Sequence, residues 1–242
     1  MKLKFLGFAL LAVCVCAVCC MCGSDSKTPD YEFPDGSDPD PQPGDYPAGL
    51  TVTEFTDDLG GGKQCLGFVA VADLKANPKL RFNAVHLPQQ KTPSRIHAEF
   101  ASANRGTACV TINAGYWWAR NSLSLLVTGG TVKSIENQTV TRNNQTVYPV
   151  RSSFGQMASG GFETHWIYCV LDDGNKPYAF PSALDNDERT NTYMSAPPTS
   201  KTPGAALWTP QEAVGGGPML VREGKNVAVE NYWNCLLYTS PS

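Results

Sequence analysis

The chain has 242 residues, with 19 basic and 22 acidic side chains and a formal net charge of −3. From Leu50 onward it holds 16 bases and 15 acids, because three of the bases (Lys2, Lys4 and Lys27) and seven of the acids fall within residues 1–49. A nearly neutral domain lacks the basic surface that neutralises phosphate backbones, so nucleic acid is excluded as an expected partner.

Residues 1–22 have the pattern of an export signal. Lys2 and Lys4 form a positive start, and the apolar run 5–18 is too short to span a bilayer. The run ends in a cysteine cluster, which is typical of bacterial lipoproteins and less so of an ordinary secretory signal. We expect Cys22 to be the lipidated residue because polar residues follow at once, with Cys19 and Cys20 as alternatives.

Residues 23–49 predict a disordered acidic linker. They are rich in Asp, Pro and Gly and cannot bury enough apolar surface to fold. A Pro-rich chain of this length reaches roughly 60–80 Å at about 3.1 Å per residue. Acidic residues after a lipidated cysteine are similar to the surface-export signal of some Gram-negative lipoproteins. The expected location is therefore the outer membrane or cell surface, with the membrane as a partner through the lipid anchor.

Residues 50–234 predict a single α+β domain of strand-rich mixed sheets with few helices. Thr92 and Pro93 begin the one expected helix, and Gly106 ends it. The polar stretch 181–203 predicts a long surface loop. Strands are expected over 51–56, 66–72 (buried), 80–85, 108–112 and 165–171, and hairpins over 123–135 and 219–229.

Four cysteines fall outside the signal: Cys65, Cys109, Cys169 and Cys235. They are far apart and show no CxxC spacing, so we expect no metal site among them. Export permits a disulfide, but buried free thiols are the preferred interpretation. We expect no cofactor.

Three segments end strands at tight turns: Ile-Asn-Ala-Gly-Tyr-Trp-Trp at 112–118, Arg-Ser-Ser-Phe-Gly at 151–155, and a glycine-rich run from residue 215. Glycine permits positive φ and lets a ligand approach the backbone. Gly215, Gly216 and Gly217 therefore either offer N–H groups to an anion or form a strained turn. No Lys-Ser or Lys-Thr follows them, which excludes a P-loop.

In this order the segments resemble the phosphodiester glycosidase family, which includes the enzyme that removes N-acetylglucosamine from a phosphodiester to uncover mannose 6-phosphate. The turn at 113–116 is similar to the family's Asn-Gly-Gly-Tyr/Phe turn, with Ala114 in place of a glycine. Residues 215–221 resemble its Gly-Gly-Gly-Pro-x-Leu-Val hairpin. The resemblance covers about residues 50–234 and implies hydrolysis of a glycosidic bond in a sugar-1-phosphodiester.

Family members usually continue with an Arg-Thr-Ala-like strand and an Asp-Gly-Gly-Gly-Ser turn, and neither occurs before Ser242. Residues 235–242 resemble a translated sequencing adapter. We therefore expect the natural sequence to differ after Asn234 and this fragment to be inactive alone. A chain without its last strands would leave sheet edges unpaired.

The implied reaction breaks a sugar C1–O–phosphate bond through an oxocarbenium-like state, with a leaving group that needs electrostatic stabilisation more than full protonation. Arg151 is the candidate phosphate ligand, with a structural ion pair as the alternative. Glu163 and His165 are two apart at a strand start, so they should face one side. They are the candidate catalytic acid or base, and a solvated strand end is the alternative.

The turn at 113–118 supplies the remaining candidates for substrate binding. Asn113 either hydrogen-bonds the sugar or phosphate or occupies an unusual backbone angle, and Gly115 allows close approach. Tyr116, Trp117 and Trp118 either stack on a sugar ring or pack in the core. The alternative function is a non-catalytic surface lipoprotein that binds glycans, favoured by the tryptophan pair, the tether and Ala114.

Overall fold

The computed structural model describes residues 46–58, 61, 64–86, 91–102, 106–118 and 121–231. The expected signal with Cys22, the linker up to residue 45, and residues 232–242 lie outside these ranges. The chain divides into two compact units. The first comprises Met1–Arg81 with Thr92–Asn113, and the second Phe82–Lys91 with Ala114–Ser242. Each is described by itself.

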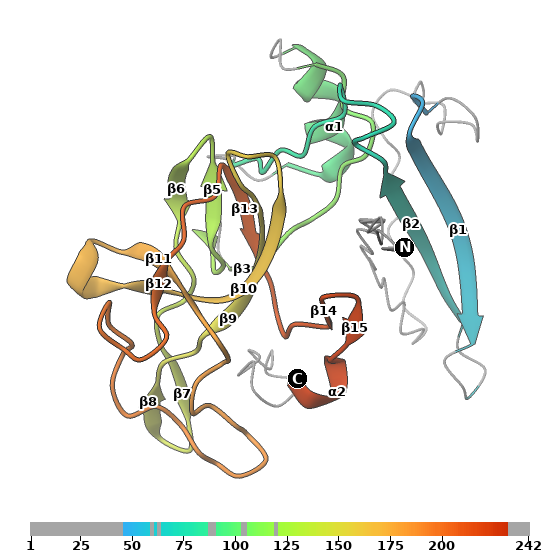
Figure 1. The fold of residues 1–242 in the computed structure, drawn as a ribbon. Helices are drawn as coiled ribbons and strands as arrows, with labels where there is room; N and C mark the ends of the chain where they lie inside the picture. Colours follow the sequence, from blue (N-terminus) through green and yellow to red (C-terminus); the bar gives the residue numbers. More distant parts are fainter. Residues whose placement is uncertain are drawn as a thin grey trace, which may run out of the picture. The chain divides into compact units, whose positions relative to one another are not determined.

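The first unit contains a two-stranded antiparallel ribbon, β1 (Leu50–Asp58) and β2 (Gln64–Ala72), drawn in blue to teal in Figure 1. Both predicted strands are confirmed. The prediction that 66–72 is buried is wrong, because Leu66 and Phe68 are about half exposed. Among the described residues of this unit, the ribbon consists of these two strands alone.

The predicted helix is confirmed as α1 (Pro93–Ser102). The Thr92 hydroxyl accepts the Arg95 N–H at 3.3 Å, which satisfies one amide that the first turn leaves without a helical partner. The predicted strand at 108–112 is wrong: these residues are irregular, and Val110 and Ile112 are exposed. Short apolar runs become strands only where a partner strand supplies hydrogen bonds.

The second unit is built on one seven-stranded sheet in the order β12-β11-β10-β9-β13-β5-β6, with short hairpins beside it (Figure 1). Its elements are β3 (Trp117–Trp118), β4 (Asn121–Ser122), β5 (Leu126–Thr128), β6 (Thr131–Ser134), β7 (Val140–Arg142), β8 (Gln145–Val147), β9 (Arg151–Gln156), β10 (Phe162–Val170), η1 (Leu171–Asp173), β11 (Lys176–Phe180), β12 (Ala206–Leu207), β13 (Glu212–Gly215), β14 (Val221–Arg222), β15 (Lys225–Asn226) and α2 (Ala228–Asn231).

The chain is therefore strand-rich with few helices, as predicted. The expectation of mixed sheets is wrong for the described strands, whose pairs are all antiparallel. Parallel neighbours need a long crossover, usually an α-helix, and no α-helix lies between the strands of the seven-stranded sheet.

The sheet is packed on both faces. Along β10, Ile167 and Cys169 join one core cluster, while Trp166, Tyr168 and Val170 join another on the opposite face. This explains why residues 166–170 read as an unbroken apolar run and not as an alternating one. We call the side that carries Ile167 and Cys169 face A.

Two predicted hairpins are confirmed. Gly129 and Gly130 join β5 to β6 with φ of 56° and 72°, and Glu223 and Gly224 join β14 to β15 with φ of 50° and 74°. Two successive residues with positive φ form the turn whose twist matches that of the flanking strands.

The predicted strand at 80–85 is wrong. Ala84 donates its N–H to the Glu212 carboxylate at 2.9 Å, and its carbonyl accepts the Thr128 hydroxyl at 2.8 Å. Side chains of the sheet thus satisfy this backbone in place of a neighbouring strand. Glu212 also accepts the Gly129 N–H, so it joins this segment to the β5–β6 turn.

The predicted loop at 181–203 is confirmed, with one isolated bridge between Asp187 and Thr192. Buried Asn186 organises it: its amide donates to the carbonyls of Tyr148 and Ala183, and its oxygen accepts the Met194 N–H.

Asp172 joins η1, which follows β10, to this loop. Its carboxylate accepts the Ser200 hydroxyl at 2.7 Å and the Ser200 N–H at 3.0 Å, and these bonds hold the pKa of Asp172 below its usual value. A depressed folded-state pKa stabilises the fold above the unfolded pKa, about 3.9, and this contribution is lost as the pH falls through the folded value.

We expect Ser200→Ala to raise the pKa of Asp172 toward its usual value, because the hydroxyl hydrogen bond is the largest cause of the lowering. Carboxyl carbon NMR titration measures this directly. Asp187 is the internal control, since Arg189 lowers its pKa instead. Equal movement of both carboxyls, or of neither, contradicts the prediction.

Cys65, Cys109 and Cys169 are free thiols, and Cys65 and Cys169 are buried, as preferred from the sequence. Cys109 is partly exposed. Burial raises the pKa of the Cys169 thiol well above its ordinary value, and the neighbouring Glu136 carboxylate raises it further. Cys235 lies outside the described residues.

Candidate functional site

Strand register places several predicted site residues on one face of the sheet. His165 lies opposite Ser153, and Ser153 lies opposite Gly215. Directly opposite residues of antiparallel strands share a face, so these three form one row across β10, β9 and β13. His165 and Gly215 are two strands apart, roughly 10 Å at about 4.8 Å per strand. The row lies on face A, with Ile167.

Glu163 and His165 face the same side, as predicted from their spacing. Glu163 Oε2 lies 3.1 Å from His165 Nε2, and the two side chains are 42% and 33% exposed. A carboxylate beside an imidazole at a partly open position can hold or transfer a proton. The pair is thus accessible and in contact, as an acid or base requires.

Trp208 is a site residue that the sequence analysis missed. Its indole N–H donates to the same Glu163 Oε2 at 2.9 Å, and its ring meets the His165 ring edge-to-face at 5.7 Å between centroids. The indole is buried, 3% exposed, over Gly155. A Cβ at Gly155 would lie 2.8 Å from the indole, so glycine at this strand position is what admits it.

The glycine-rich turn after β13 is held by the sheet. Gly215 donates to the Leu125 carbonyl at 2.7 Å and Gly216 to the Ser152 carbonyl at 2.8 Å. The Ser152 hydroxyl donates to the Gly217 carbonyl at 2.8 Å. The second and third motif segments, more than 60 residues apart in the sequence, are therefore in direct contact.

The first motif meets the same turn through Gly115. This residue has a φ of 68°, and an added Cβ would lie 2.7 Å from Ser124 and 3.0 Å from the Gly215 carbonyl. Tyr116 donates its N–H to the Ser124 hydroxyl at 2.8 Å, and its side chain is exposed. The structure thus brings Gly115, Tyr116 and Gly215 together.

The glycines of this turn differ in whether the surrounding atoms leave room for a side chain. A Cβ at Gly215 would lie 2.8 Å from the Leu125 nitrogen, so packing alone requires glycine there. A Cβ at Gly216 would meet nothing closer than 3.9 Å, and its φ is not positive. Neither packing nor strain accounts for Gly216, which leaves the approach of a ligand as the prediction for that position.

Arg151 is buried, 3% exposed, and faces the same side as Ile167. Its charge acts on buried Glu136: burial raises the pKa of Glu136, and the guanidinium lowers it in part. The structural ion-pair alternative for Arg151 stays a prediction. Phosphate binding by Arg151 remains a prediction.

Asn113 belongs to the first unit, and Trp118 lies in a short hairpin of the second. Asn113 is the last residue of the first unit, where it is exposed. The backbone of Trp118 pairs with Asn121 in the β3–β4 hairpin, and the side chains of Trp117 and Trp118 lie outside the description.

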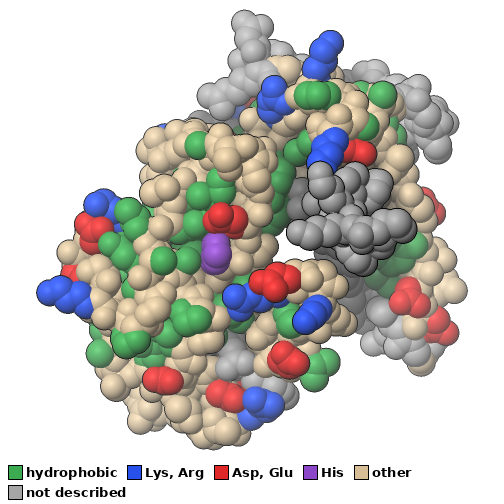
Figure 2. Space-filling view, viewed as in Figure 1, with side chains coloured by type: hydrophobic (Ala, Val, Ile, Leu, Met, Phe, Trp, Pro, Cys, Tyr) green, Lys and Arg blue, Asp and Glu red, His purple; other side chains and the backbone are tan. Residues whose placement is uncertain are grey.

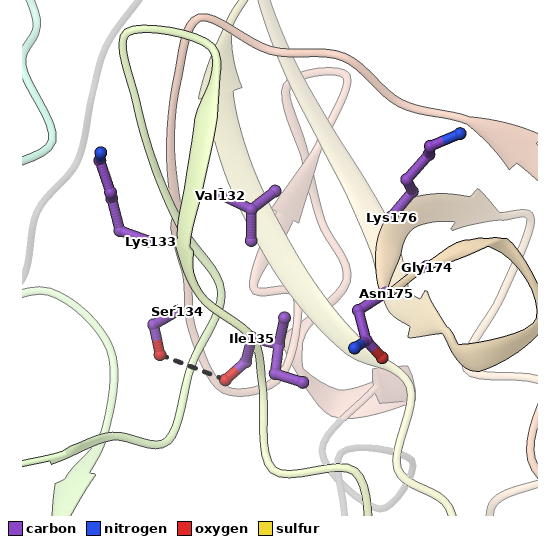
Figure 3. Close-up of a pocket in the computed structure, with 7 residues that line it drawn as sticks. All are labelled: Val132, Lys133, Ser134, Ile135, Gly174, Asn175 and Lys176. Carbon is purple, nitrogen blue, oxygen red and sulfur yellow. Dashed lines mark hydrogen bonds between the residues drawn. The ribbon is translucent and has the colours of Figure 1, made fainter.

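A hollow of about 500 Å³ lies elsewhere in the second unit. Figure 3 shows Val132 and Ile135 on one side of it, with Asn175 and Lys176 across from them, and Lys133 directed away. No predicted site residue lines it. In the described ranges no group of three or more His, Cys, Asp or Glu is placed to hold a metal ion.

Charged side chains are scattered on the visible face, with blue and red interspersed and no broad area of one sign (Figure 2). This agrees with the near balance of bases and acids from Leu50 onward. Among the described residues, no helix has the length and apolar character needed to cross a membrane.

Comparisons with known proteins give no relative: no protein-family model, no curated protein and no solved structure matches this chain.

Proposed function

We propose that residues 50–234 form a hydrolase, a single α+β catalytic domain, that cleaves the glycosidic bond of sugar-1-phosphodiesters on a glycan outside the cytoplasm. The observation that carries the proposal is the meeting of the three motif segments. Gly115 packs on Ser124 and the Gly215 carbonyl, and Ser152 bonds both Gly216 and Gly217. If each of the three segments only formed a turn, their contact with one another would not be expected.

The site residues divide by position. The open space beside Gly216 is assigned to the approach of the phosphodiester, since a missing side chain leaves room there. The Gly216 N–H is donated to the Ser152 carbonyl, so this residue supplies space and not a hydrogen bond. Glu163 and His165 supply the proton-transferring pair on the same face, in the strand next to Ser153. The leaving phosphate monoester needs little protonation, so one such pair suffices. The exposed Tyr116 ring is assigned to the sugar.

The test is release of reducing sugar from a panel of methyl diesters of sugar 1-phosphates, with simple methyl glycosides as the comparison substrates. It is run on the purified chain and on the chain continued by the sequence of its source locus after Asn234. Cleavage restricted to the phosphodiesters supports the proposal. Binding of the same diesters without release of sugar by either form favours the non-catalytic glycan-binding alternative and overturns the enzyme.

Gly216→Ala sharpens this test. Its methyl group has room in the fold, so we expect unchanged stability but a loss of activity on the order of a hundredfold, as for a ligand displaced by about 1 Å. Gly161→Ala is the matched control, since its added Cβ also meets only ordinary contact at 3.6 Å. Full activity in Gly216→Ala removes this residue from the site.

The proposal includes lipid anchoring through Cys22, which lies outside the described residues. We expect Cys22→Ser to abolish incorporation of labelled palmitate and to release the protein from the membrane fraction. Incorporation that persists in Cys22→Ser but stops in Cys20→Ser or Cys19→Ser moves the anchor to that residue. If the wild type incorporates no palmitate, or if none of the three substitutions stops its incorporation, lipid anchoring through these cysteines is contradicted.

A further inference from the structure

One carboxylate oxygen receives two contacts in the candidate site. Glu163 Oε2 accepts the Trp208 indole N–H at 2.9 Å and lies 3.1 Å from His165 Nε2. An indole N–H can only donate, so Oε2 is an acceptor in this arrangement. The neutral imidazole then donates from Nε2 to the same oxygen. Its Nδ1 is left with the lone pair, which is the atom that can take a proton.

Trp208 is in a position to hold this geometry. Its ring is buried over Gly155, its edge meets the His165 ring, and its backbone N–H donates to the Pro177 carbonyl at 3.0 Å. A buried ring fixed at both backbone and side chain cannot follow a moving carboxylate. The partly exposed Glu163 is therefore oriented by Trp208, and not the reverse.

We propose that Trp208 and Glu163 are positioning residues for His165, and that the proton-accepting atom of the site is His165 Nδ1. Trp208 fixes the carboxylate, and the carboxylate fixes the Nε2–H tautomer. This inference rests on the proposed function for its chemical step and on the contacts alone for its tautomer.

The step balances as a hydrolysis. Nδ1 takes a proton from water as the water oxygen forms a bond to the sugar C1. The C1–O bond to phosphate breaks, and its electron pair leaves on the phosphate oxygen. The resulting imidazolium, paired with the Glu163 carboxylate, returns its proton to solvent before the next turnover. His165 is the catalytic residue, and Glu163 and Trp208 act through it.

The tautomer is measured by long-range proton–nitrogen NMR of the histidine rings at about pH 8.5, roughly two units above the ordinary histidine pKa. The chain has three histidines, so the His165 signals are identified by their loss in His165→Gln. We expect the Nε2–H form in the wild type and a mixture of both tautomers in Trp208→Phe. Trp166→Phe is the matched control, a buried tryptophan on the opposite face.

The kinetic arm uses the phosphodiester substrates. We expect His165→Gln and Glu163→Gln to lower kcat by about a thousandfold or more, the scale of losing the carboxylate that sets a catalytic tautomer. Trp208→Phe should lower kcat about tenfold with KM unchanged. Trp166→Phe should leave both constants within about twofold.

An Nδ1–H tautomer in the wild type overturns the inference, as does a Trp208→Phe spectrum identical to that of Trp166→Phe. Undiminished turnover by His165→Gln also overturns it. No turnover by the wild type, combined with the Nε2–H tautomer, overturns the proposed function and the chemical step while supporting the positioning of His165.

Discussion

Gly155→Ala is expected to destabilise the second unit by about 2–3 kcal/mol and to break the contact between Trp208 and Glu163. The added methyl would lie 2.8 Å from the indole ring and 3.0 Å from the Ala213 methyl. Gly155 is the fifth of the six residues of β9, which lies between β10 and β13, so neither neighbour can move without disturbing the sheet. Overpacking of this kind costs about 1–3 kcal/mol.

Urea unfolding followed by far-UV circular dichroism gives the change in the free energy of unfolding. Gly161→Ala is the matched control, since it makes the same chemical change where the nearest atom is 3.6 Å away, and it should shift stability by less than about 0.5 kcal/mol. If the two variants unfold at the same urea concentration, the indole does not occupy the space over Gly155.

Glu136→Ala is expected to cost about 1–3 kcal/mol, the usual cost of leaving a buried hydrogen-bond donor without its acceptor. The Glu136 carboxylate accepts the Cys169 N–H and the Gln138 side-chain amide, and it provides counter-charge to Arg151. All of this is lost in the variant. The exposed Glu99→Ala, which removes a helical ion pair with Arg95, should cost no more than about 0.5 kcal/mol.

The same carboxyl gives stability a pH dependence of definite sign. Burial raises the folded-state pKa of Glu136, so the folded protein binds its proton more tightly than the unfolded chain does. This contribution is fully present below the unfolded pKa, about 4.3, and is lost as the pH rises through the folded value. Glu136→Gln lacks this pH dependence, because a glutamine side chain does not titrate.

We therefore expect the free energy of unfolding of the wild type to fall, relative to that of Glu136→Gln, as the pH rises above about 4.3. Thermal or urea unfolding of both proteins across that range measures the difference. A constant difference, or one that grows in favour of the wild type, shows that Glu136 is not buried as a raised-pKa group.

Local signals were sufficient for β1, β2, β10, α1 and two hairpins, but not for β7, β8, β11 and β12. The α1 helix is marked by Thr92 and Pro93, and the β5–β6 hairpin by two glycines that alone determine its turn. The errors at 80–85 and 108–112 have a common cause. Both are short apolar or alternating runs, and whether such a run becomes a strand depends on a distant partner that pattern does not reveal.

The site was predictable where spacing determines geometry and not elsewhere. Glu163 and His165 share a face because side chains alternate along β10. Trp208 is 45 residues from Glu163 in the sequence, so no local pattern connects them. The indication in the sequence is Gly155, since a glycine inside a strand such as β9 often marks the close approach of another group.

The sheet order also determines when the second unit can form. β13 lies between β9 and β5, yet it is the last of these three strands along the chain. Until Glu212–Gly215 is available, β5–β6 and β9–β10–β11 are separate pieces with unpaired edges where they should join. A nascent chain shorter than this cannot close its sheet, so folding is delayed until most of the polypeptide has been made. Such a chain depends on binding by other factors, or on rapid completion of synthesis, to keep those edges from pairing with a second copy.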